Sequence, residues 1–444
     1  MSERKLSLGL FVYAFGHSPA GWLHPGSPLD AATSLPYFQT LARTAEDALL
    51  DFLFFADLPA SAEGSYEFRS RVPTHMNRFE PITLLSALAA STKNIGLAAT
   101  ASTSFTEPFN VARQFASLDH LSGGRSAWNV VTSDHVSAAR NFGKDQMDSH
   151  EVRYARAREH LEVVNGLWDS FESDALKLDR ERGVYLDANK VHPLNHKGPH
   201  FSVRGPLNIS RSPQGKPVIA QAGGSEEGMD FAAETADVVF TVAGTIEKAR
   251  SFRQSLHNRM KRFGRTPDQI KVLPGINIIV GENDEAARTK LEELLSAMHP
   301  EAGKAVLSQF LETDLSDISF DDKFPVERLP TQAKGSKSLF ETMSEFVRQG
   351  LTLRELVRVF AEKQAGNGIL GSPGRVADFM EGWMKGEAAD GFILMLPSLP
   401  SSLTDVAQLL VPELQRRGLF RTGYEGSTLR TNLGLSTPIN RYEA

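Results

Sequence analysis

The sequence predicts an α/β protein, a (β/α)8 TIM barrel in which strands and helices alternate from one end of the chain to the other. Short apolar runs occur eight times, and several are apolar almost throughout, as parallel strands buried on both faces should be. A helical pattern follows each run, and eight strand–helix repeats are the count of this barrel. A doubly wound open sheet is the main alternative.

The expected elements follow one another in this order. Strands are predicted at Leu6–Val12, Phe52–Ala56, Ile95–Ala101, Ala127–Val131, Val218–Gln221, Val238–Val242, Val272–Val280 and Phe392–Leu396. Helices are predicted at Leu35–Leu50, Pro81–Thr92, Pro108–Leu121, His150–Phe171, Ser225–Ala236, Ile246–Phe263, Asp284–Met298, Gly374–Gly386 and Leu403–Leu414.

We expect residues 1–444 to form a single domain with insertions after strands four and seven. Residues 172–216 are polar and rich in Pro, Gly and His, and residues 299–372 contain the acidic loop DLSDISFDDKFP. Loops of this length are uncommon unless they are functional. In a barrel we expect both insertions near the active-site face, and we expect the polar tail 421–444 to wrap the surface.

Composition restricts the class of protein. The hydrophobic share is 41 %, the charged share 23 % and the net charge −6, all ordinary for a soluble globular protein without a nucleic-acid surface. The absence of cysteine excludes disulfides, thiolate metal sites and cysteine nucleophiles. The basic and apolar start resembles a signal peptide, but Ser7 and Gly9 interrupt it, so we prefer a buried strand. We expect a cytoplasmic protein that binds neither nucleic acid nor membrane.

Polar side chains stand where the predicted strands end, which is where a TIM barrel carries its chemistry. Asp57 follows strand two and Thr103 follows strand three. Asn129 lies within strand four, and Gln221–Ser225 (QAGGS) ends strand five. Hydroxyls, amides and backbone N–H groups suit a large neutral heterocycle with a phosphate tail better than a metal or a phosphorylated sugar. No metal site is expected.

The segment QAGGSEEG is the candidate phosphate loop. Gly223 and Gly224 let the backbone approach a ligand closely, and Ser225 can cap a helix whose N-terminus attracts anions. The two following glutamates count against a phosphate, and a plain glycine turn with a serine cap is the alternative. His150 and Tyr154 share one helix face four residues apart and can hold the same ligand, or they simply pack there.

Aromatic residues of the first two strand–helix units and of strand six can line an apolar pocket. The candidates are Phe11, Trp22, Phe55 and Phe240. His17, in the loop GHSPAGWLHPG, is the candidate acid–base group, since histidine titrates near neutral pH. The chain has no Gly-x-Gly-x-x-Gly after a strand, no P-loop and no Gly-x-Ser-x-Gly elbow. A redox enzyme built on this chain therefore needs its reducing equivalents from elsewhere.

The sequence resembles the bacterial-luciferase superfamily, and in particular its nitrilotriacetate and dibenzothiophene-sulfone monooxygenase branch. The resemblance rests on FTEPFNVARQFASLDHLSGGRSAWNVVTS, SHEVRYARAREHLEVVNGLWDSFE, GPLNISRSPQGKPVIAQAGGSEEG and GSPGRVADFMEGWMKGEAADGFILM, with shorter segments along nearly the whole chain.

The resemblance implies an FMNH2-dependent monooxygenase that receives reduced FMN from a separate NAD(P)H:flavin reductase. O2 then gives a flavin C4a-(hydro)peroxide that oxidises a small organic substrate. The residues implied in FMN binding are Asp57, Thr103, Asn129, His150, Tyr154, Ala222, Gly223, Gly224 and Ser225. Asn129 and His17 are the candidate catalytic residues. The superfamily also suggests a homodimer or homotetramer.

Two alternatives stay open at the level of the sequence. One is hydride transfer with deazaflavin F420 in the same superfamily, and the other is a non-catalytic flavin-binding barrel. The loop WLHP has Leu23 where the branch often has arginine. Carboxylate and sulfonate substrates are therefore expected less than neutral ones.

Overall fold

Eight parallel strands form a closed ring in the computed structural model, which describes residues 4–61, 70–73, 76–311, 313–330, 337–366 and 369–443. The ring closes because β1 pairs with β13 and β10 pairs with both β9 and β11. The barrel strands are β1 (Ser7–Phe11), β2 (Phe52–Phe55), β3 (Gly96–Ser102), β4 (Ser126–Val131), β9 (Val218–Ala222), β10 (Val238–Thr241), β11 (Lys271–Val280) and β13 (Gly391–Met395). The closure confirms the TIM barrel and excludes the open sheet.

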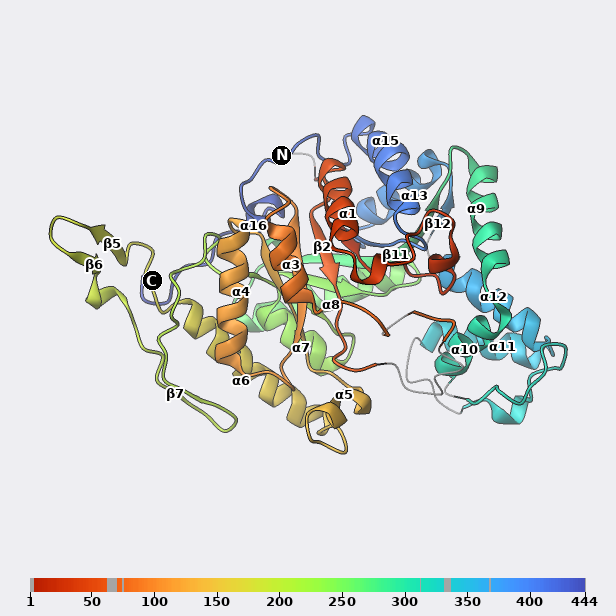
Figure 1. Ribbon diagram of the computed structural model, residues 1–444, viewed down its shortest axis with the longest axis horizontal. Helices are drawn as coiled ribbons and strands as arrows, with labels where there is room; N and C mark the ends of the chain where they lie inside the picture. The colour runs from red at the N-terminus through yellow and green to blue at the C-terminus, as the bar shows by residue number, and fades with distance from the viewer. Residues whose placement is uncertain are drawn as a thin grey trace.

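Helices surround this ring (Figure 1). They are α1 (Leu35–Asp47), α3 (Pro81–Ala89), α4 (Pro108–Ser122), α6 (His150–Trp168), α7 (Glu226–Thr235), α8 (Ile246–Met260), α13 (Pro373–Lys385), and α14 (Ser401–Asp405) running through η7 (Val406–Leu410) into α15 (Val411–Arg416). Each of them overlaps a predicted helix, whereas the short α5 (Val136–Asn141) was not predicted. Within the described ranges, no helix combines the length and the hydrophobicity needed to cross a bilayer.

The strand side chains alternate between two apolar layers, as a pleated strand requires. On β4, Ala127 belongs to the cluster inside the barrel, whereas Trp128 and Val130 pack outward against the helices. Asn129 therefore faces the barrel interior, where its Nδ2 donates to Thr100 Oγ1 at 2.8 Å.

The turn that leads from α4 into β4 depends on two glycines. Gly123 has φ 67° and Gly124 has φ 91°, both in the region that L side chains disfavour. A Cβ on Gly124 would also lie 2.8 Å from Thr428 Cγ2 of the C-terminal tail. The glycine pair in LSGGR thus sets the direction from which β4 enters the barrel.

The first insertion lies at the amino end of the barrel, not at the active-site face as expected. It contains β5 (Leu176–Asp179), β6 (Val184–Leu186), β7 (His196–Lys197) and β8 (Ser202–Val203), and β5 and β6 extend away beside the C-terminus (Figure 1). Asn440 Nδ2 donates to the carbonyl of Phe171 at 2.8 Å, and His192 stacks on Tyr442. The prediction was wrong because α6 starts at the carboxyl face, so its far end delivers the insertion to the opposite face.

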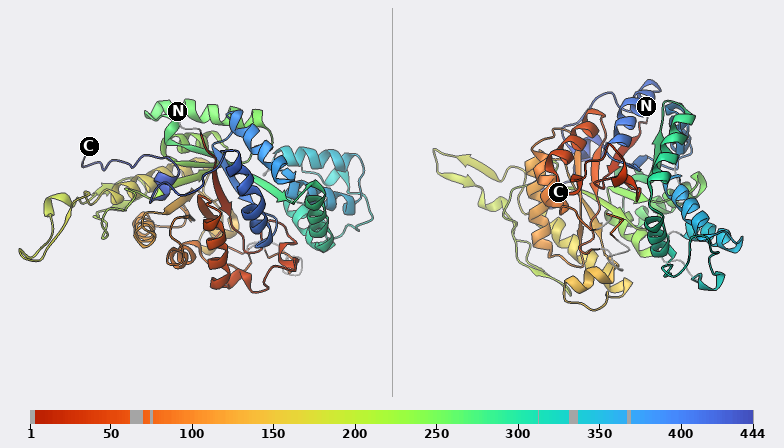
Figure 2. Two further views of the ribbon diagram at one scale, coloured as in Figure 1. Left: turned by 90° about the horizontal axis from the view of Figure 1, so that it is seen from above. Right: turned by 45° about the vertical axis from the view of Figure 1, so that its right-hand side comes forward.

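The second insertion builds a helical lobe beyond the carboxyl end of β11 (Figure 2). It comprises α10 (Pro300–Leu311), α11 (Lys337–Arg348), α12 (Leu353–Gly366) and β12 (Ile369–Gly371), and it packs beside α9 (Asp284–Ala297), which overlaps the helix predicted after strand seven. β12 continues the sheet beside β11. The lobe has its own apolar cluster, which includes Leu307, Leu315 and Phe360.

The C-terminal tail contributes to the barrel core, which corrects the expectation of a surface wrap. Around α16 (Leu429–Asn432), Leu429, Leu433 and Leu435 join the interior cluster and close the amino end of the barrel. Arg430 pairs with Asp237 at 2.9 Å. Because the tail is polar overall, its composition did not predict that these three leucines are buried.

Candidate active site

A polar cleft opens at the carboxyl ends of β2, β4 and β9, between the first turns of α6 and α7. Its volume is about 360 Å³, which lies within the range of ligand-binding pockets. The lining residues include Asp57, Ser133, His150, Arg153, Tyr154, Ala222, Gly223, Gly228 and Phe231. Five residues predicted from different parts of the sequence, namely Asp57, His150, Tyr154, Ala222 and Gly223, therefore meet in one cleft.

His150 and Tyr154 line one corner of this cleft, and Ser225, which like Gly224 is not among the lining residues, lies beside His150. The rings of His150 and Tyr154 lie 4.6 Å apart, and Ser225 Oγ lies 3.4 Å from His150 Nε2. Ser225 also caps α7 by accepting a hydrogen bond from Gly228 N at 3.1 Å. A Cβ on Gly228 would lie 2.9 Å from Tyr154 Oη, so a glycine there lets the tyrosine reach the helix start. The N-terminus of α7 and these side chains together make a site for an anion.

Arg153, which sequence reasoning missed, adds a cation to this corner. Its Nη1 donates to the carbonyl of Ser133, and its buried Nε has no hydrogen-bond partner among the described residues. Ser133, two residues after the end of β4, has φ 45°, which is uncommon for a residue other than glycine. The signal available in the sequence was the spacing, since Arg153 follows His150 by three residues on the same helix.

The two glutamates of α7 do not oppose an anion as their sequence suggested. Glu226 pairs with Arg259 of α8, and Glu227 Oε2 lies 3.7 Å from His150 Nδ1. The first carboxylate is neutralised outside the cleft, and the second faces the histidine. Neither carboxylate is among the residues that line the cleft.

Asp57 sits beside the loop that precedes α3. Its Oδ1 lies 2.9 Å from Arg78 Nη2, which also donates to the carbonyl of Leu58 at 2.6 Å. Burial raises the pKa of Asp57, while Arg78 lowers it. Asp57 and Arg78 thus form a partly desolvated ion pair on one wall of the cleft.

Deeper in the barrel, Asn129 leaves one polar atom without a partner. Its Oδ1 is buried and accepts no hydrogen bond from the described residues. Native proteins rarely leave such an atom unsatisfied unless a ligand or water meets it. Thr103 is different, because its Oγ1 donates to the carbonyl of Val131 at 3.1 Å and fastens the end of β3 to β4. Thr103 does not line the cleft.

An aromatic cluster fills the mouth of the barrel. Phe11 contacts Phe54 at 5.1 Å between ring centroids, and Phe54 stacks with Phe240 at 6.2 Å. Phe55 lies on the opposite face of β2, where its ring is 6.0 Å from Phe38. Phe54 therefore faces the barrel interior and Phe55 the helices, because adjacent residues of a strand face opposite sides.

His17 packs against this cluster with its ring 4.7 Å from that of Phe11. Burial lowers the pKa of His17 to about 4. Its Nε2 lies 3.2 Å from the carbonyl of Phe11, which can only accept, so Nε2 carries the proton and Nδ1 is the acceptor. The ring is therefore neutral at neutral pH, and the acid–base role expected for His17 stays a prediction.

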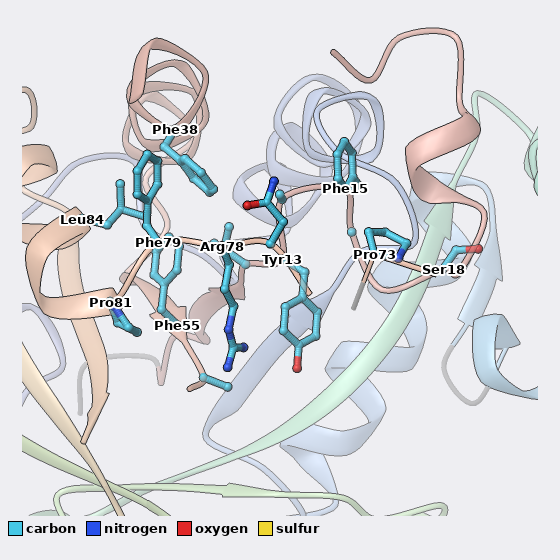
Figure 3. Close-up of a pocket in the computed structure, with 15 residues that line it drawn as sticks. Tyr13, Phe15, Ser18, Phe38, Phe55, Pro73, Arg78, Phe79, Pro81 and Leu84 are labelled. Atoms are coloured by element: carbon cyan, nitrogen blue, oxygen red, sulfur yellow. The ribbon is translucent and has the colours of Figure 1, made fainter. Parts of the chain in front are cut away.

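A second, much narrower cavity of about 60 Å³ adjoins the cleft on the side of the β1 loop. Figure 3 shows its lining, with Phe15, Phe38 and Phe79 at one end and the polar ends of Tyr13 and Arg78 at the other. Phe55 lines this cavity too. Trp22 lies further out, where its Nε1 donates to the carbonyl of Arg71 at 3.2 Å.

Comparison with known proteins identifies relatives of the whole chain. The family described as luciferase-like monooxygenase matches residues 11–382. The N-acetyl-S-(2-succino)cysteine monooxygenase of Bacillus subtilis (strain 168) is 46 % identical and covers 99 % of both chains. Nitrilotriacetate monooxygenase component A of Aminobacter aminovorans is 43 % identical over 99 % of this chain and 98 % of its own. The dibenzothiophene-sulfone monooxygenase of Rhodococcus erythropolis is 38 % identical over 98 % of each.

Solved structures give the same result. DmoA from Hyphomicrobium sulfonivorans superposes with a TM-score of 0.86 at 35 % identity, covering 97 % of this chain and 92 % of that one. A riboflavin lyase solved with modified FMN and riboflavin superposes with a TM-score of 0.83 at 33 % identity, covering 99 % and 98 %. All of these proteins are similar to this chain along almost its full length.

Proposed function

The chain belongs to the luciferase-like monooxygenase family, and we propose that it is an FMN-dependent monooxygenase that oxidises a small organic molecule with O2. The observation that carries the proposal is the anion corner, where His150, Arg153 and Tyr154 line the cleft and Ser225 lies beside them. FMN has a phosphate at one end, which would occupy this corner, and a flat heterocycle at the other end, which would lie near the aromatic cluster of the barrel mouth.

The residues fit FMN at both ends. Arg153 Nε and the hydroxyls of Tyr154 and Ser225 would hold the phosphate, together with the backbone from Ala222 to Ser225. These groups are donors, and a phosphate presents only acceptors. At the other end, Asn129 Oδ1 would accept a hydrogen bond from a ring N–H, which would satisfy its unpaired acceptor. Asp57 lines the wall between the two ends.

Bound reduced FMN would supply the electrons that activate O2 for transfer of one oxygen atom to the substrate. Phe11, Phe54 and Phe240 would exclude water from the reacting atoms. His17 would act as a neutral ring, with the proton held at Nε2 by the Phe11 carbonyl and with Nδ1 as an acceptor. Thr103 would fix the ends of β3 and β4 on which the cofactor rests.

Reduced flavin would come from a separate NAD(P)H:flavin reductase. The chain has no dinucleotide fingerprint, and the relative from Aminobacter aminovorans is called component A, which supports a second component. We further propose a cytoplasmic homodimer or homotetramer, in keeping with a chain that has no cysteine. Sedimentation analysis would measure the oligomeric state.

The test of this function is isotope transfer. The protein would be supplied with NADH, a flavin reductase, FMN and ¹⁸O2, together with each compound named for the three relatives. One ¹⁸O atom in a product is the expected result. Oxidation of none of them, with oxygen reduced only to peroxide, would favour a non-catalytic flavin-binding barrel. Hydride transfer with reduced F420 and no oxygen incorporation would favour the F420 alternative.

A further inference from the structure

The cavity beside the cleft has two chemically different ends. Phe15, Phe38 and Phe79 make one end apolar, and Figure 3 shows the guanidinium of Arg78 and the phenol of Tyr13 pointing away from them. Burial raises the pKa of Tyr13, and the charge of nearby Arg78 lowers it. The phenol therefore remains a protonated donor at neutral pH, next to the guanidinium that is paired with Asp57.

Arg78 has a buried hydrogen-bond donor with no acceptor among the described residues. A guanidinium carries five N–H donors in a planar fork. Nη2 serves Asp57 Oδ1 at 2.9 Å and the Leu58 carbonyl at 2.6 Å. Nη1 is buried and has no partner among the described residues. A buried, charged donor at the polar end of a cavity points to an acceptor on a ligand.

We propose that Arg78 and Tyr13 bind a carboxylate of the substrate, so that the enzyme acts on organic acids. A carboxylate offers two acceptor oxygens, which match one edge of the guanidinium fork and the neighbouring phenol. The apolar end would take the remainder of the molecule. The inference rests on the proposed function, because it assigns the cavity to the substrate of that reaction.

The proposal changes an expectation drawn from the sequence. Leu23 stands where the branch that the sequence resembles often has arginine, and for this reason acidic substrates were expected less than neutral ones. Leu23 is partly exposed, and it does not line the cavity. Arg78 brings a cation into the same region from the loop that precedes α3. The sequence alone does not show that Arg78, in a different loop from Leu23, supplies a cation to this region.

The test is a calorimetric titration of FMN-loaded protein with nitrilotriacetate and with N-acetyl-S-(2-succino)cysteine. Dibenzothiophene sulfone serves as the uncharged comparison. We expect at least one acid to bind more tightly than the sulfone. Arg78→Met should weaken that binding about 10- to 100-fold, and Arg78→Lys should recover part of it. Arg71→Met removes an exposed charge from the same loop and should change nothing.

Several results would overturn the inference. One is that neither acid binds, and another is that Arg78→Met binds the acids as the wild type does. A third is that Arg78→Lys, which keeps a charge beside Asp57, weakens FMN as much as the acid, since Arg78 would then hold the flavin. Failure of the wild type to bind FMN is a separate result that removes the proposed function instead. Thermal unfolding of each variant checks that it is folded.

Discussion

Replacing Arg153 with methionine tests the anion corner at a single side chain. The change keeps much of the aliphatic stem and removes the guanidinium, including the buried Nε and the hydrogen bond to the Ser133 carbonyl. Hydrogen bonds to a charged group contribute about 1.5–3 kcal/mol. The dissociation constant for FMN should therefore rise about 10- to 150-fold.

Riboflavin makes the assay specific, because it carries the same ring system without the phosphate. We expect fluorescence titration to show that Arg153→Met weakens FMN strongly and riboflavin hardly at all. Arg158→Met is the matched control, since Arg158 lies on the same helix but pairs with Glu234. Equal losses for FMN and riboflavin in Arg153→Met would refute the assignment of Arg153 to the phosphate.

Three further perturbations follow from the same structure. Gly228→Ala places a Cβ 2.9 Å from Tyr154 Oη, so the tyrosine must move and FMN binding should weaken by about tenfold, measured by titration. Burial lowers the pKa of His160 to about 3, so the stability that its neutral ring contributes is complete above pH 6.5 and is lost as the pH falls. Urea unfolding at pH 7.5 and at pH 5 measures this loss. Between the two pH values the free energy of unfolding of His160→Gln should fall by about 2 kcal/mol less than that of the wild type. Arg421→Met breaks the buried pair with Asp51 and should lower the free energy of unfolding by about 3–5 kcal/mol, with partial recovery when Asp51→Asn is added.

Each of these predictions has a contradicting result. Gly382→Ala, where a Cβ meets nothing within 4 Å, is the control for the glycine change, and equal effects of the two would remove the argument from Tyr154. An unchanged pH dependence in the His160 variant would mean that this ring is not the group titrating. Full stability of the Arg421 variant would show that the buried pair makes no net contribution.

The barrel could be predicted from the sequence because the patterns that indicate its strands and helices are local. Each strand is a short apolar run and each helix a periodic pattern, so the order of elements follows from neighbouring residues alone. Ring closure of such elements fixes where the strand ends meet. For that reason Asp57 could be predicted to lie in one cleft with His150 and Tyr154, although about 90 residues of the chain separate it from them.

The errors have physical causes that a single sequence does not reveal. β2 reads Phe-Leu-Phe-Phe, and alternation cannot tell which phenylalanines face inward when every position is apolar. Arg153 looks like any solvated helix residue until its buried Nε is seen. Burial lowers the pKa of His17 because it disfavours the charged ring, and a single sequence does not show which rings the fold buries.

Anaerobic titration of the wild-type protein with reduced FMN tests the central claim most directly. Reduced F420 is titrated in parallel, and Ser225→Asp adds a negative charge to the anion corner. The account predicts saturable binding of reduced FMN, strong weakening when a carboxylate is placed at position 225, and no comparable binding of F420. No binding of FMN in either redox state, or equal binding by wild type and Ser225→Asp, would contradict it.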